Sequence, residues 1–143
     1  RLQHAEGIVF HGPLPGKDIP ELLGRAKYLI VTESFDPAAR RRTRYSLSTK
    51  IGESLASGAC ILAYGPEEIS SIRYLEAHQA ACILRRAEDA PALLRQLEAD
   101  PELYQSYVRR AGQLAEAAHD PQTNRQAVCR LLQQVCAAGE VQL

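Results

Sequence analysis

The sequence predicts an α/β fold in which a Rossmann-like parallel sheet is flanked by helices and followed by a helical C-terminal tail. Three observations carry this prediction. Short apolar runs without polar alternation recur in the first part of the chain, as in strands buried on both faces. Segments of helical periodicity separate these runs, which is typical of parallel βαβ units. After Glu88 the pattern is helical only.

The chain is long enough for one domain with a hydrophobic core. It has 143 residues, of which 45% are hydrophobic, so its composition is that of a globular protein. We expect residues 1–88 to form the α/β part and residues 89–143 to form helices that pack on the same domain. Because the chain contains no methionine, even at position 1, we also expect it to be a piece of a longer protein.

Four strands are predicted. They cover Ile8–Phe10, Tyr28–Val31, Cys60–Ala63 and Ala80–Leu84. Ligands of open parallel sheets bind at the carboxyl ends of the strands. We therefore expect the loops that follow Phe10, Val31 and Ala63 to face one cleft.

The segments between the strands predict helices and one loop. Asp18 can cap a short helix that has a proline in its first turn. A polar, arginine-rich loop is expected from about Thr32 to Tyr45. Further helices are predicted over Thr49–Ser57, which Gly58 can end, and over Glu67–Ala77.

Three helices are predicted after Glu88, each where an aspartate at the N-cap precedes a proline in the first turn. The pairs are Asp89 with Pro91, Asp100 with Pro101 and Asp120 with Pro121. Two apolar stripes at helical spacing follow, Leu103, Tyr107, Ala111, Leu114 and Ala118, then Val128, Leu131, Leu132 and Val135. We expect these helices to pack on the sheet and on each other.

The charge balance and the lengths of the apolar runs argue against nucleic acid as a partner and against a membrane-spanning segment. Seventeen basic and seventeen acidic side chains cancel, so no global field favours nucleic acid. The local exception is Arg40-Arg41-Arg42 with Arg44. No apolar run approaches the length of a membrane span.

The cysteines and histidines predict no metal site and no cofactor. The four cysteines form no Cys-x-x-Cys pair, and Cys60 and Cys82 lie in strand-like runs, so we expect buried, reduced thiols. Cys129 and Cys136 are seven residues apart on a predicted helix, too far for an unstrained disulfide. The four histidines lack ligand spacing.

The segment from Ser46 to Gly58 is the most informative part of the chain. Ser46, Ser48 and Thr49 form a hydroxyl-rich loop before a helix, whose first turn exposes N–H groups and a partial positive charge that suit phosphate. Lys50 adds a point charge suited to a diphosphate, and Glu53 can accept hydrogen bonds from a vicinal diol. The combination favours a nucleotide sugar, although a capped surface helix with a Lys–Glu pair has the same spacing.

This segment, continued by Ala59–Pro66, resembles the donor-binding segment of family 4-type (group 1) glycosyltransferases of the GT-B fold. Val9-Phe10-His11-Gly12 is similar to that family's strand ending in Phe-x-Gly. The segment Ala26–Val31 resembles its next apolar strand, and Asp100–Leu103 the start of a late helix. The similarity is clear over residues 7–85.

The resemblance implies the C-terminal, nucleotide-sugar-binding part of an enzyme that transfers a sugar with retention of configuration. The amides near Ser46, Ser48 and Thr49 would hold the diphosphate, Lys50 would neutralise it, and Glu53 would hold the ribose hydroxyls. Gly12 would lie near the base, and Arg44 would supply a further positive charge. The resemblance identifies no catalytic residue.

The resemblance also implies partners and a location. The donor would be a UDP- or GDP-sugar, and a glycan or lipid-linked acceptor would bind an N-terminal domain outside this chain, so the piece alone would be inactive. The expected role is polysaccharide biosynthesis in the cytoplasm, with peripheral association at the inner face of the membrane as a further expectation. No nucleic acid is expected.

Two alternatives remain open on the sequence. A nucleotide-sugar epimerase of the same fold would use catalytic acids and a histidine between two domains. A non-catalytic α/β interaction module would bind no nucleotide at all and would not place Lys50 and Glu53 in a cleft.

Overall fold

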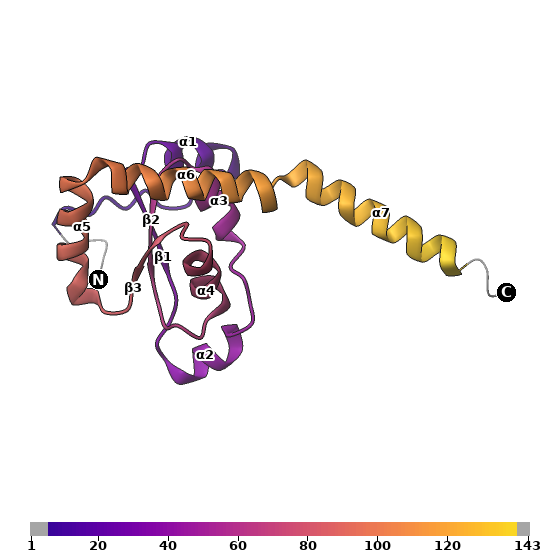
Figure 1. Ribbon diagram of the computed structural model, residues 1–143, viewed down its shortest axis with the longest axis horizontal. Coiled ribbons are helices and arrows are strands. Elements are labelled where there is room, and N and C mark those ends of the chain that lie inside the picture. The colour runs from indigo at the N-terminus through magenta and orange to yellow at the C-terminus, as the bar shows by residue number, and fades with distance from the viewer. Residues whose placement is uncertain (1–5, 140–143) are drawn as a thin grey trace.

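The computed structural model describes residues 6–139 and has the predicted α/β architecture (Figure 1). Three parallel strands form an open sheet in the order β1 (Tyr28–Thr32), β2 (Cys60–Tyr64) and β3 (Cys82–Leu84). Tyr28 is in register with Cys60, and Leu62 with Cys82. The predicted fold class and three of the four predicted strands are confirmed.

The fourth predicted strand, Ile8–Phe10, is wrong. These residues belong to none of the strands in residues 6–139, and their side chains are exposed. A strand forms only where the backbone N–H and C=O groups pair with a neighbouring strand. An apolar run predicts burial, but no segment of the described chain pairs with this one.

Strand β2 is buried on both faces, as its uninterrupted apolar sequence predicts. Ile61 and Ala63 belong to a cluster with side chains of α3 (Lys50–Ala56), α4 (Ser70–Ala77) and α6 (Pro101–Ala118). Cys60 and Leu62 belong to a second cluster with side chains of α5 (Ala90–Ala99) and α6. The sheet is therefore a middle layer between helices.

The expected loop at residues 32–45 contains a helix, α2 (Pro37–Thr43). Asp36 caps it, because its Oδ2 accepts a hydrogen bond from the Ala39 N–H at 2.8 Å. The Asp-Pro pair at its start is the same signal that predicts helix starts elsewhere in the chain, and it could have predicted this one.

Two other helices begin differently from the prediction. The helix α1 (Ile19–Gly24) forms, but Asp18 makes no side-chain cap because it already lies in a 3₁₀ turn, η2 (Gly16–Asp18). Helix α4 begins at Ser70 rather than near Glu67, because Pro66 starts a turn that the Ile69 N–H closes on the Pro66 carbonyl. Helix α3 ends as predicted, with Gly58 at a φ of 80°.

The tail forms α5, α6 and α7 (Pro121–Gly139), with η3 (Ala87–Asp89) before α5. Asp100 and Asp120 cap α6 and α7, whereas Asp89 lies in η3 and makes no cap. The stripe on α6 packs as expected through Ala111 and Leu114. The boundary at residue 88 stays a prediction.

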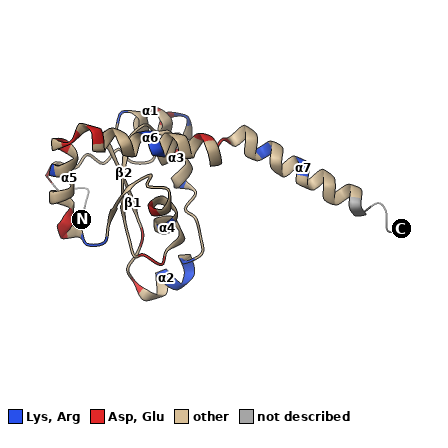
Figure 2. Cartoon of the chain, in the orientation of Figure 1, with Lys and Arg blue, Asp and Glu red and all other residues tan. Residues whose placement is uncertain are grey.

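Helix α7 extends away from the sheet, so the expected packing of its stripe is wrong (Figure 1). Val128, Leu131, Leu132 and Val135 are between 56% and 63% exposed. The helix is also mostly uncharged (Figure 2). Helical periodicity determines which face of a helix is apolar, but it does not determine what covers that face.

The contrast between buried and exposed leucines gives a stability test. We expect Leu55→Ala, at a side chain 1% exposed, to lower the free energy of unfolding by about 2–5 kcal/mol because it leaves a cavity. The matched control Leu131→Ala, 60% exposed on α7, should change it by less than about 0.5 kcal/mol. Urea denaturation measures both. A large cost at Leu131 would mean that the α7 stripe is covered in solution.

The cap of α7 gives a pH test. Hydrogen bonds from Thr123 hold the pKa of Asp120 below its ordinary value, so its stabilising effect is complete above the unfolded-state pKa and disappears as pH falls through the folded-state pKa. We expect the helical NMR shifts of the first turn of α7 to decrease over that acid range. Asp120→Asn keeps a capping oxygen without a titrating group, so it should remove this dependence. An unchanged profile in Asp120→Asn would contradict the assignment.

Candidate functional site

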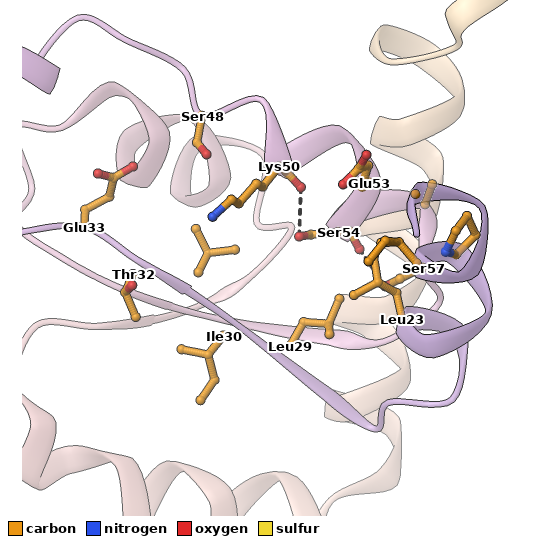
Figure 3. Close-up of a pocket in the computed structure, with 15 residues that line it drawn as sticks. Leu23, Leu29, Ile30, Thr32, Glu33, Ser48, Lys50, Glu53, Ser54 and Ser57 are labelled. Atoms are coloured by element: carbon orange, nitrogen blue, oxygen red, sulfur yellow. Dashed lines mark hydrogen bonds between the residues drawn. The ribbon is translucent and has the colours of Figure 1, made fainter. Parts of the chain in front are cut away.

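A groove of about 760 Å³ lies between α1, β1 and the start of α3 (Figure 3). One side is apolar, formed by Ile19, Pro20 and Leu23 of α1 with Leu29 and Ile30 of β1. The other side is polar and is formed by residues of α3 and the loop before it. A concave site with an apolar wall and a few charged groups is typical of small-molecule binding.

Three of the seven predicted site residues, Ser48, Lys50 and Glu53, line this groove (Figure 3). Lys50 extends along the groove, with Glu33 and Glu53 on opposite sides of it. Its carbonyl accepts a hydrogen bond from the Ser54 hydroxyl at 2.9 Å, which ties it to the next turn of α3. The predicted cluster of a cation, a carboxylate and a hydroxyl is therefore present in one cavity.

The other four predicted residues, Gly12, Arg44, Ser46 and Thr49, are not among the residues that line the groove. Gly12 lies in the segment before η2 and has a φ of 70°. Thr49 directly precedes α3, has helical backbone angles and makes no side-chain cap. Its backbone already continues the helix, whereas an N-cap side chain acts from an extended backbone.

The arginine segment lies on α2 and at its end (Figure 2). Arg40 forms an ion pair with Glu68, and the guanidinium of Arg44 lies 5.2 Å from the centre of the Tyr45 ring. The Arg44 carbonyl accepts hydrogen bonds from Ser70 of α4. Contacts of Arg44 thus connect the end of α2 to the start of α4.

Sequence reasoning missed Glu33, which follows β1 and lines the groove opposite Glu53. Its N–H donates to the Tyr64 carbonyl at 2.8 Å. A Cβ at Gly65 would lie 2.8 Å from the Cβ of Glu33 and 2.9 Å from Cγ1 of Ile72. Glycine at position 65 therefore permits this close approach. The rule that site residues follow the strands could have identified Glu33, since it comes two residues after Val31.

The thiols divide between the core and the surface. Cys60 and Cys82 are buried and reduced, with their sulfur atoms 3.9 Å apart. Cys129 and Cys136 are exposed on α7, contrary to expectation, because this helix leaves the sheet. Within residues 6–139 no group of three or more His, Cys, Asp or Glu side chains could hold a metal ion. In the same residues no helix is both long and apolar enough to cross a membrane.

A family model described as glycosyl transferase-like matches residues 3–130 of the chain, which include the whole groove. No curated protein and no solved structure matches.

The close approach at Gly65 predicts opposite effects for two glycine substitutions. We expect Gly65→Ala to lower the free energy of unfolding by about 1–3 kcal/mol, because the new methyl group would push Glu33 and Ile72 away. The control Gly112→Ala lies in α6 with open space around it and should raise stability by about 0.5–1 kcal/mol. Urea denaturation measures both. Equal effects would contradict the close packing at Gly65.

Proposed function

Because this chain belongs to the glycosyl transferase-like family, we propose that it binds the nucleotide-sugar donor of a glycosyltransferase. The family assigns it to glycosyl transfer and implies a sugar donor and an acceptor. The observation that carries the proposal is the groove in which Lys50, Glu53 and Ser48 face an apolar wall.

The groove suits the chemistry of a nucleoside diphosphate sugar. Lys50 is a compact cation that can neutralise a diphosphate, and the Ser48 hydroxyl can donate to a phosphate oxygen. Glu53 can accept hydrogen bonds from the two ribose hydroxyls, as carboxylates do in dinucleotide sites. The apolar wall on α1 and β1 suits the flat face of a base or a sugar ring.

The roles of Gly12, Arg44, Ser46 and Thr49 rest on the resemblance alone. We keep Gly12 as a residue near the base and Thr49 and Ser46 as part of the phosphate loop. Arg44 remains a proposed source of positive charge. Its carbonyl accepts a hydrogen bond from Ser70 of α4, and its guanidinium lies over the ring of Tyr45. The proposed roles of Lys50 and Glu53 have the further support that both residues line the groove.

The proposed reaction moves a sugar from the donor to an acceptor hydroxyl with retention of configuration. The contribution of this part is electrostatic, because the leaving diphosphate develops negative charge that Lys50 can stabilise. We propose that a glycan or lipid-linked acceptor binds outside this chain and that residues 1–88 carry the donor site. The proposed setting is polysaccharide synthesis in the cytoplasm, peripheral to the membrane.

Calorimetry on the full-length protein tests the donor site. We expect UDP or GDP, and the corresponding sugar nucleotides, to bind with micromolar affinity, and Lys50→Ala and Glu53→Ala each to weaken binding by about tenfold or more. The control variants Lys27→Ala and Glu116→Ala remove a lysine and a glutamate side chain that lie outside the groove. They should bind the nucleotide as the unmutated protein does.

Three results would count against this function. No binding by a folded protein would favour an interaction module. Equal losses in the control variants would mean that the groove is not the site. Conversion of the sugar nucleotide to an isomer, without transfer, would favour an epimerase.

A further inference from the structure

Two serines at the start of α4 hold the loop that leads into the groove. The Ser71 hydroxyl accepts a hydrogen bond from the Ser48 N–H at 3.1 Å and donates to the Ser46 carbonyl at 3.4 Å. The N–H and the hydroxyl of Ser70 both donate to the Arg44 carbonyl, at 2.9 and 2.8 Å. Four hydrogen bonds therefore connect one turn of α4 to residues 44–48.

The start of α4 is a fixed support for this loop. Ser71 is 0% exposed, and the neighbouring Ile69 and Ile72 are equally buried in the core. A buried hydroxyl that both donates and accepts cannot turn away without leaving a buried polar group unpaired. The core thus determines where the Ser71 hydroxyl lies, and that hydroxyl determines where Ser48 lies.

The loop determines where the groove's polar groups lie. Ser48 lines the groove itself, and Lys50 follows two residues later at the first position of α3. The Ser48 carbonyl accepts a hydrogen bond from the Ile51 N–H at 3.1 Å, so Ser48 is bonded directly to the first turn of that helix. Glu53 projects from the same short helix.

We propose that Ser71, assisted by Ser70, is a positioning residue for the donor groove. Its hydroxyl does not contact the ligand; it orients Ser48 and the start of α3, so that Lys50 and Glu53 face the ligand together. This inference rests on the proposed function of the groove. Such positioning matters because small displacements of binding groups weaken contacts that depend on distance and angle.

Hydrogen exchange and calorimetry on the full-length protein separate the two proposals. We expect Ser71→Ala to accelerate exchange of the Ser48 amide by about tenfold, with or without ligand, because its acceptor is gone. We expect the Kd for UDP or GDP to rise about threefold to tenfold, because ligand binding must then order the Ser48 loop without the Ser71 hydrogen bond. Ser70→Ala should have a smaller effect, since its N–H still bonds Arg44.

Two further variants distinguish positioning from general stability. Ser106→Ala removes a hydroxyl that donates to the Leu103 carbonyl on α6, away from the groove, and should change neither measurement. Ser71→Thr keeps the hydroxyl and should restore slow exchange and binding. If Ser71→Ala does not fold, Ser71→Cys keeps the size of the side chain and replaces the hydroxyl with a thiol that donates and accepts only weakly, so exchange of the Ser48 amide and the Kd should shift in the same direction by a smaller amount.

Each outcome decides one question. Unchanged exchange of the Ser48 amide in Ser71→Ala would overturn the positioning role. Faster exchange with unchanged nucleotide affinity would also overturn it, because the loop would not matter to binding. If Ser71→Ala speeds exchange but the unmutated protein binds neither UDP nor GDP, the support of the loop by Ser71 would stand. The proposed donor function would be refuted instead.

Discussion

Burial of β2 on both faces is the constraint on which the rest of the structure depends. Ile61 and Ala63 need one layer of helices, and Cys60 and Leu62 need another, because a strand that is apolar on both faces gains its full stability only when both faces leave water. The connections on either side of β2 contain α3 and α4, which supply the first layer. Parallel pairing with β1 and β3 then brings the carboxyl ends of all three strands to one edge.

The candidate site is assembled at that edge by close contacts between segments distant in sequence. Gly65, at the end of β2, allows Glu33 at the end of β1 to approach, and Ser71 of α4 holds Ser48 before α3. The groove therefore combines residues of α1, β1 and α3 that the core, rather than the loop itself, brings together. A site held from the core in this way is organised before a ligand arrives, which lowers the cost of binding.

Membership of the glycosyl transferase-like family and the lining of the groove both support the proposal that this chain binds a sugar donor. The family assigns the kind of reaction, and the groove supplies a cation and two carboxylates beside an apolar wall. Helix α7 has no part in this groove. It extends from the sheet with an exposed apolar stripe, and none of its side chains belongs to the buried core of the described residues (Figure 1).

The sequence alone determined the strands β1 to β3, most helix starts, and the cluster of Ser48, Lys50 and Glu53, because these follow from short-range patterns: apolar runs, Asp-Pro pairs and spacing along a helix. Tertiary structure decided the rest. Ile8–Phe10 and α7 carry apolar patterns as clear as those of the core, yet they remain exposed, because a pattern cannot specify its partner. Glu33 and Ser71 join the site only through contacts with Gly65 and Ser48, which lie more than twenty residues away along the chain.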